Sequence, residues 1–109
     1  MRITALFTAF LLLLFAAGGV SAVTITDDLG VTVTIENPPE RIVSLSPANS
    51  EILFALGLDE KIVGVTEYCT YPEAALSKEK IGGFSTVNIE KVSVLNPDLI
   101  VAADGNSEE

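Results

Sequence analysis

Three short polar segments stand where binding chemistry is expected, each directly after an apolar run that predicts a β-strand. They are Ser46-Pro47-Ala48-Asn49, Thr66-Glu67-Tyr68-Cys69 and Ala103-Asp104-Gly105-Asn106. If the three runs form parallel strands of one sheet, their carboxyl ends lie along the same edge, where open α/β sheets bind ligands. Hydroxyl, amide, carboxylate and phenol groups gathered there can hold a small molecule. The sequence therefore predicts a binding site at this edge.

The same residues give little support to catalysis. The chain has no histidine and one cysteine, Cys69, so neither a serine–histidine–aspartate set nor an internal disulfide can be assembled from it. No glycine-rich phosphate loop, dinucleotide fingerprint or metal-ligand spacing occurs, and nothing specific supports acid–base work by Glu67 and Asp104. We predict no catalytic residue and no metal site. Cys69 is expected to be a small buried side chain; the alternatives are a ligand contact or a disulfide with a cysteine outside this chain.

The elements that must position the site alternate between strands and helices. Two β-branched runs, 23–26 and 31–35, flank a turn and predict a hairpin, and Asn37-Pro38-Pro39 forms a stiff connector. Strands that are apolar throughout and alternate with helices predict a parallel sheet covered on both faces. The remaining expected elements are strands at 42–45, 62–65 and 99–102, an extended piece at 81–84, and helices at 47–56, 72–76 and 88–95.

The boundaries of two helices can be read from their capping residues. Ser46 is placed to cap the first helix, Pro47 occupies its first position, and Gly57 ends it. Pro97 stops the last helix. The residues expected to face inward are Ala48, Ile52, Ala55 and Leu56 in the first helix and Ile89, Val92 and Leu95 in the last.

The first 22 residues have the pattern of a secretory signal peptide. Arg2 supplies a positive charge, residues 5–17 form an apolar core, and Val20-Ser21-Ala22 offers small residues at the usual cleavage spacing. We expect cleavage after Ala22; the alternative is an uncleaved anchor, since residues 3–22 nearly suffice to span a bilayer. No cysteine near the cleavage site offers a lipoprotein anchor. The protein is therefore expected in the periplasm or at the outer cell surface.

The charge balance narrows the choice of partners. The formal net charge is −9, from 6 basic and 15 acidic residues. Such a surplus of acid disfavours binding to nucleic acid and to anionic lipid. It suits a soluble exported protein, or one that offers carboxylates to a basic partner.

A linked series of motifs runs from Pro39 almost to the end of the chain. The longest is PERIVSLSPANSEILFALG at 39–57, followed by VGVTEYCTYP at 63–72, IGGFS at 81–85, NIEK at 88–91 and NPDLIVA at 96–102. Together they resemble the iron-complex and cobalamin-binding proteins of ABC importers. The resemblance implies two α/β lobes joined by one long rigid helix, with the ligand in the cleft between the lobes.

The resemblance also implies a domain organisation. Residues 1–22 are the expected signal peptide, 23–38 a hairpin lead-in with its proline connector, and 39–109 an incomplete N-terminal lobe. Asn106-Ser107-Glu108-Glu109 has the pattern of a helix start, with a capping residue followed by acids. We therefore expect the chain to be part of a longer protein.

Roles for particular residues follow from the same resemblance. Tyr68 stands where the cobalamin-binding member places an aromatic side chain against the corrin, and Phe84 where a bulky aromatic lies over the ligand; an ordinary loop tyrosine and a core phenylalanine are the alternatives. Glu90 matches a surface glutamate that pairs with permease arginines, the alternative being a solvated acid in a first helical turn. For Ser46-Pro47-Ala48-Asn49, plain helix capping is the alternative to ligand contact. The candidate ligand-binding residues are Ser46, Pro47, Ala48, Asn49, Glu67, Tyr68 and Phe84.

The expected function is capture of an iron complex or cobalamin and its delivery to an ABC permease. We expect a monomer with no resident cofactor. A bare-metal receptor and a secreted α/β enzyme are the alternatives, and the lack of histidine disfavours both. A cobalamin-type or neutral ligand is favoured over an anionic siderophore, because no basic residues gather at the predicted edge; they are Arg41, Lys61, Lys78, Lys80 and Lys91.

Overall fold

The structure, a computed structural model, describes residues 22–106, which divide into two units between Pro38 and Pro39. The expected signal peptide lies outside the described residues except for Ala22, and so do residues 107–109 of the expected helix start. Within the described part of the chain, no helix is long and apolar enough to cross a membrane.

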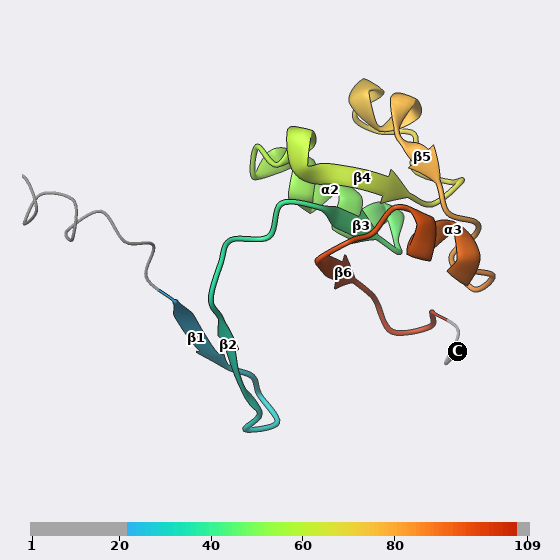
Figure 1. Ribbon diagram of the computed structural model, residues 1–109. Helices are drawn as coiled ribbons and strands as arrows, with labels where there is room; N and C mark the ends of the chain where they lie inside the picture. Colours follow the sequence, from blue (N-terminus) through green and yellow to red (C-terminus); the bar gives the residue numbers. More distant parts are fainter. Residues whose placement is uncertain (1–21, 107–109) are drawn as a thin grey trace, which may run out of the picture. The chain divides into compact units, whose positions relative to one another are not determined.

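The first unit is a β-hairpin of β1 (Val23–Thr26) and β2 (Thr32–Ile35), paired antiparallel (Figure 1). Asp27 organises the turn, because its carboxylate accepts hydrogen bonds from the backbone N–H groups of Leu29 at 2.9 Å and Val31 at 2.8 Å. The alternating β-branched runs thus form the hairpin they predicted, with β2 one residue shorter than expected.

The second unit contains a four-stranded parallel sheet with the strand order β5-β4-β3-β6. The predicted parallel α/β arrangement is confirmed. One strand is displaced from its expected place, because β5 precedes the apolar piece at 81–84 and consists of a glutamate and a lysine. Charged residues are tolerated there since β5 is an edge strand. The strands are β3 (Ile42–Ser44), β4 (Ile62–Val65), β5 (Glu79–Lys80) and β6 (Leu99–Val101).

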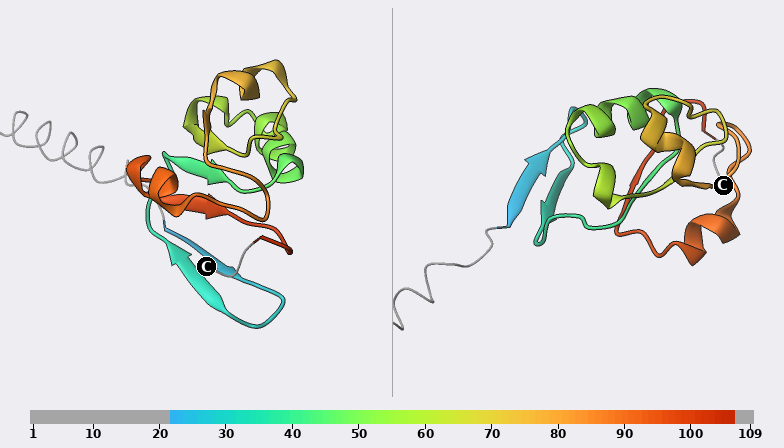
Figure 2. Two further views of the ribbon diagram at one scale, coloured as in Figure 1. Left: turned by 90° about the vertical axis from the view of Figure 1, so that its right-hand side faces the viewer. Right: turned by 90° about the horizontal axis from the view of Figure 1, so that it is seen from above.

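Helices α2 and α3 lie on opposite faces of this sheet (Figures 1 and 2). The start of α2 is the predicted one, since Ser46 Oγ accepts a hydrogen bond from the backbone N–H of Asn49 at 3.2 Å. The short helix expected at 72–76 is a 3-10 helix displaced by one residue. The helical elements are α2 (Pro47–Ala55), η1 (Asp59–Lys61), η2 (Glu73–Ser77) and α3 (Ile89–Val94).

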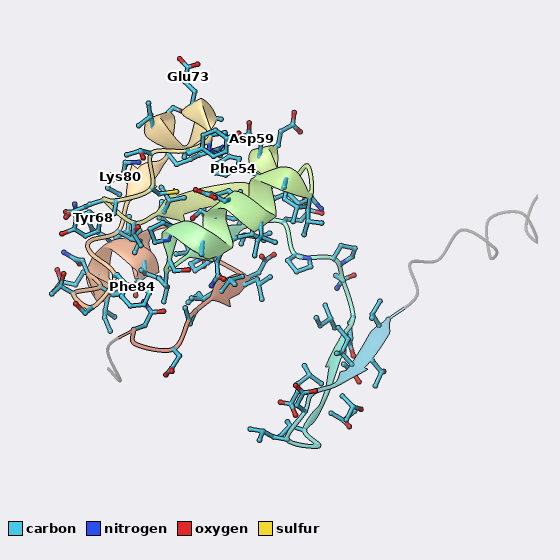
Figure 3. The ribbon with its side chains drawn as sticks, turned by 180° about the vertical axis from the view of Figure 1, so that it is seen from behind. Phe54, Asp59, Tyr68, Glu73, Lys80 and Phe84 are labelled. Atoms are coloured by element: carbon cyan, nitrogen blue, oxygen red, sulfur yellow. The ribbon has the colours of Figure 1, made fainter. Side chains whose placement is uncertain are left out.

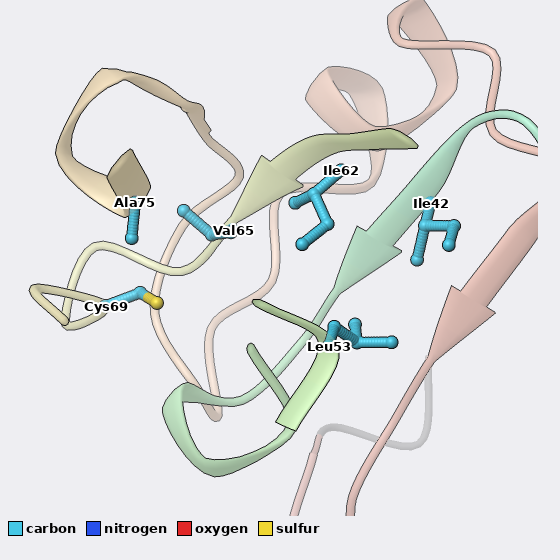
Figure 4. Packing of buried hydrophobic residues seen from close by; sticks show 6 residues of the cluster. All are labelled: Ile42, Leu53, Ile62, Val65, Cys69 and Ala75. Carbon is cyan, nitrogen blue, oxygen red and sulfur yellow. The ribbon is translucent and has the colours of Figure 1, made fainter. Parts of the chain in front are cut away.

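Each face of the sheet has its own hydrophobic cluster. Ile42 and Val43 are neighbours on β3 and point to opposite faces, so each belongs to a different cluster. Burial of one such side chain stabilises the fold by about 1.5–3 kcal/mol. The cluster on the α2 face comprises Ile42, Leu53, Ile62, Val65, Cys69 and Ala75 (Figure 4), and that on the α3 face Val43, Ile81 and Val92.

The inward face of α2 differs from the prediction. Ser50 and Leu53 are the buried residues, whereas the expected stripe of Ala48, Ile52, Ala55 and Leu56 is exposed. Apolar residues occur on several sides of this helix, so their pattern does not identify the buried side. A polar contact does: the Ser50 hydroxyl lies 2.9 Å from Ser44 Oγ and 3.0 Å from the Ser46 carbonyl oxygen.

The prediction for α3 was correct at Val92 and wrong at Ile89. Val92 is buried, Leu95 is partly buried, and Ile89 is 48% exposed. Ile89 lines an open groove of about 350 Å³ together with Leu45, Val87, Val92, Ser93 and Ile100. As the first residue of a six-residue helix, it borders this groove instead of the packed core.

Asp98 joins the amino ends of β3 and β6. Its two carboxylate oxygens accept hydrogen bonds from the backbone N–H groups of Glu40 and Arg41, each at 2.9 Å. The Arg41 guanidinium donates to the carbonyl oxygen of Leu95 at the end of α3, through Nε at 2.9 Å and Nη2 at 2.6 Å. The backbone donors of Glu40 and Arg41 lower the pKa of Asp98 from its ordinary 3.8, since they favour the charged form.

We expect Asp98→Asn to lower the free energy of unfolding at neutral pH, with a difference from the parent that narrows in acid. The folded state lowers the pKa of Asp98. The carboxylate therefore stabilises the fold at pH values above its ordinary pKa of 3.8, and this contribution is lost as the pH falls through the lower pKa of the folded state. Denaturant unfolding of both proteins between about pH 7 and about pH 2 measures the difference. A difference that stays constant with pH would contradict the role given to the carboxylate.

Candidate ligand-binding site

The segments that follow the strands converge at the carboxyl edge of the sheet, as the sequence predicted. The backbone N–H of Leu45 donates to Val101 O at 2.9 Å, and Asn49 Nδ2 donates to Ala102 O at 3.1 Å. On the other side of the edge, the backbone N–H of Glu67 donates to Gly82 O at 2.9 Å. The segments after β3 and β6 are therefore bonded to each other, and so are those after β4 and β5.

Asn106 connects these two halves of the edge. Its Nδ2 donates to Leu45 O at 2.9 Å and to Phe84 O at 2.7 Å, while its Oδ1 accepts the backbone N–H of Ala103 at 2.6 Å. The sequence predicts a capping role for Asn106 in a helix start. In the structure its side chain joins three segments, and no local signal indicates partners 61 and 22 residues away.

Tyr68 and Phe84 lie on the same side of the lobe (Figure 3). A Cβ atom on Gly83 would stand 3.5 Å from Tyr68 Cε2, so the tyrosine ring lies beside the Gly83 backbone. A Cβ atom on Gly105 would stand 3.1 Å from Phe84 Cε1, so the phenylalanine ring lies against Gly105. Tyr68 is 67% exposed and Phe84 is partly buried. The two rings therefore offer an aromatic surface at the predicted edge.

The segment Ser46–Asn49 combines a structural part with an accessible one. Ser46 is only 3% exposed, and its hydroxyl caps α2. Pro47 has no backbone N–H to offer, and the Asn49 amide donates to Ala102 O. Ala48 is the exposed residue of this turn. Direct contact with a ligand is thus open to Ala48, whereas Ser46 acts from beneath the surface by holding the helix start.

The charged groups at this edge are two acids and Lys80, which is the last residue of β5 and pairs with Val65 at the end of β4. Glu67 and Asp104 follow β4 and β6 and are both exposed. Lys61 and Lys78 form salt bridges with Glu40 at 3.7 Å and Asp59 at 2.7 Å, away from these segments. Lys80 Nζ donates to Ala75 O at 2.9 Å and Arg41 binds Leu95 O. A ligand that reaches this edge therefore meets carboxylates and aromatic rings.

Glu90 lies apart from the ligand-binding candidates. It is exposed in the first turn of α3, and it lines a groove of about 530 Å³. Neither this groove nor the one beside Ile89 includes Tyr68 or Phe84. The groove at Glu90 is lined by Glu79, Asn88, Glu90, Lys91, Val94 and Leu95.

Cys69 is a buried free thiol with 1% exposure, packed in the cluster on the α2 face (Figure 4). The prediction of a small buried side chain is confirmed. Among residues 22–106, no three histidine, cysteine, aspartate or glutamate side chains are grouped so as to hold a metal ion.

Comparison with known proteins identifies the family. Residues 42–108 match the family described as periplasmic binding protein. The chain belongs to this family. This periplasmic binding protein is 49% identical over 84 residues to the ABC transporter substrate-binding lipoprotein YvrC of Bacillus subtilis. The match covers 77% of this chain and 26% of YvrC. It is 51% identical over 65 residues to the vitamin B12-binding protein of Vibrio cholerae, covering 60% of this chain and 24% of that protein.

Solved structures of several ligand-binding proteins share the fold. The vitamin B12-binding protein BtuF of Vibrio cholerae superposes with a TM-score of 0.57 over 60% of this chain and 26% of BtuF, at 51% identity. The haem-binding protein HmuT gives 0.66 over 84% of this chain and 30% of HmuT, at 30% identity. Staphylococcus aureus SirA, complexed with staphyloferrin B, superposes with a TM-score of 0.59 over 73% of this chain and 29% of SirA, at 30% identity. The chain spans about a quarter of the length of the curated relatives it matches.

Proposed function

We propose that this periplasmic binding protein captures a corrinoid or an iron chelate and delivers it to an ABC import permease. The observation that carries the proposal is the aromatic surface of Tyr68 and Phe84 at the carboxyl edge of the sheet. Large flat ligands bind well to such surfaces, because aromatic side chains bury much apolar area and stack on ring systems. The similarity to a vitamin B12-binding protein and to haem- and siderophore-binding structures supports the same ligand class.

Within this class, a corrinoid is the ligand that the charges favour. Glu67 and Asp104 are exposed beside the aromatic rings. Arg41, Lys61 and Lys78 bind groups elsewhere in the lobe. Lys80, at the end of β5, is partly buried and its Nζ donates to Ala75 O. A strongly anionic ligand would meet like charge at this edge. A neutral macrocycle would not, and it would still contact both rings.

The proposed architecture follows the resemblance of the motifs. Residues 1–22 direct export, residues 23–38 form the lead-in, and residues 39–109 belong to the N-terminal lobe of a two-lobe receptor. In this arrangement Tyr68, Phe84 and Ala48 face a cleft whose second wall comes from the other lobe. The receptor acts as a monomer outside the cytoplasm, without catalytic chemistry, and Glu90 contacts the permease.

We expect Tyr68→Ala in the full receptor to weaken cobalamin binding about tenfold, because an aromatic contact is lost from the ligand. The matched control is Tyr71→Ala, which removes a tyrosine of similar exposure, 69% against 67%, from the same segment. Titration with cobalamin, haem and a panel of ferric siderophores, followed by intrinsic fluorescence, measures both variants. If the parent receptor binds none of these compounds, the proposed function is wrong; equal losses in the two variants would refute the role of Tyr68.

A further inference from the structure

The side chain of Asn106 donates both of its amide hydrogens and accepts one hydrogen bond inside the candidate site. Its two Nδ2 hydrogens go to the carbonyl oxygens of Leu45 and Phe84, at 2.9 and 2.7 Å, and its Oδ1 accepts the N–H of Ala103 at 2.6 Å. These partners lie after β3, after β5 and after β6. A single partly buried side chain therefore ties three separate segments to one point.

Few other side chains could replace this arrangement. Aspartate has nearly the same shape, but it would turn a carboxylate toward two carbonyl oxygens that need donors. Alanine would leave both carbonyl oxygens and the Ala103 N–H without their partner. Only a primary amide supplies two donors and one acceptor at this reach.

The bond to Phe84 matters most, because it acts on the candidate aromatic surface. Phe84 stands in a short loop that is closed by the bridge between Gly82 and Val87. Asn106 holds the carbonyl oxygen of Phe84, and the residue next to Asn106, Gly105, lies against the Phe84 ring. The backbone and the ring of Phe84 are thus both held by the segment that follows β6.

We propose that Asn106 is a positioning residue for ligand binding: by clamping the Phe84 loop to the segments after β3 and β6, it presents the Phe84 ring to the ligand in a preorganised position. The proposal rests on the proposed function as far as the ligand is concerned. The clamp itself is a property of the lobe, so it has a measurement that needs no ligand.

The matched control is Asp98, which makes the same kind of connection at the opposite end of the same two strands. Asp98 accepts two backbone hydrogen bonds at the amino ends of β3 and β6, whereas Asn106 bonds to the segments at their carboxyl ends. Asp98→Ala therefore removes two bonds between these chain segments and leaves Phe84 untouched. A loss that merely reflects a weaker fold would appear in Asp98→Ala and in Asn106→Ala alike.

The first measurement follows Phe84 directly in the full receptor without ligand. With fluorine-labelled phenylalanine, the Phe84 resonance is assigned by its absence in Phe84→Leu. We expect Asn106→Asp and Asn106→Ala to shift or broaden this resonance, and Asp98→Ala to leave it in place. An unchanged Phe84 resonance in both Asn106 variants would overturn the proposal, whatever the receptor binds.

The second measurement uses cobalamin as the probe. We expect Asn106→Ala to weaken binding about tenfold, because preorganisation of the ring is lost. In a Phe84→Ala background the same substitution should have little further effect, since Asn106 acts through that ring. Additive losses in the double variant would overturn the proposal. If the parent receptor fails to bind cobalamin, haem and siderophores, the proposed function fails, and the resonance of Phe84 alone decides the role of Asn106.

Discussion

Gly82→Ala is expected to lower the free energy of unfolding by about 3 kcal/mol, a large effect for the addition of one methyl group. Gly82 has a φ of 108°, and a Cβ atom there would stand 2.5 Å from Thr86 O and 3.0 Å from Asn88 N. Both neighbours are backbone atoms, one in the loop that carries Phe84 and one at the N-cap of α3 just after it, so they cannot rotate away. The loop between Gly82 and Val87 must open, and Phe84 must move with it. Chemical denaturation measures the loss, and cobalamin titration measures its consequence for the ligand.

Gly57→Ala separates the two causes of this effect. Gly57 also has a positive φ, 79°, but a Cβ atom there would have no neighbour within 4 Å. Its replacement should cost only about 1 kcal/mol, the penalty for an L-residue in the left-handed region. Similar losses at Gly57 and Gly82 would show that backbone conformation alone matters, and that the loop holding Phe84 is not tightly closed.

The sequence indicated the strands and the convergence of their loops because both depend on local patterns. β-Branched alternating runs predicted β1 and β2, and apolar runs predicted β3, β4 and β6. Ser46-Pro47 marked the start of α2 by capping chemistry that operates within one turn. Parallel strands then place their following segments at one edge, whatever the detailed packing.

Features that depend on distant partners were not predictable. The buried side of α2 is set by Ser50, whose hydroxyl lies near Ser44 Oγ on β3, whereas the apolar residues of the helix suggested another side. Asp98 bonds to backbone groups 57 and 58 residues away, and Asn106 to Leu45 61 residues away. Each is an ordinary loop residue in the sequence. Only the fold brings its partners within hydrogen-bonding distance.

Glu90→Ala should weaken docking of the receptor to its permease while ligand affinity stays nearly unchanged. Glu90 is exposed in the first turn of α3, in a groove that contains neither Tyr68 nor Phe84. A basic side chain on the permease would lose its carboxylate partner and remain partly desolvated at the interface. Loss of such a hydrogen-bonded charge pair costs about 1–3 kcal/mol, a roughly 5- to 150-fold weaker complex. Equilibrium cobalamin binding and transporter-dependent uptake are the two readouts.

Two comparison variants make the result specific to Glu90. Glu73→Ala removes another exposed acid, which stands at the start of the helical turn η2 (Figure 3) and is not among the residues that line the groove at Glu90. Its effect on docking should be small, since a general loss of negative charge changes long-range attraction only modestly at physiological salt. Tyr68→Ala should show the opposite pattern to Glu90→Ala, with weaker ligand binding and intact docking. Loss of ligand binding with intact docking in Glu90→Ala would mean that the helix α3 surface belongs to the ligand site, and that the permease contacts another face of the lobe.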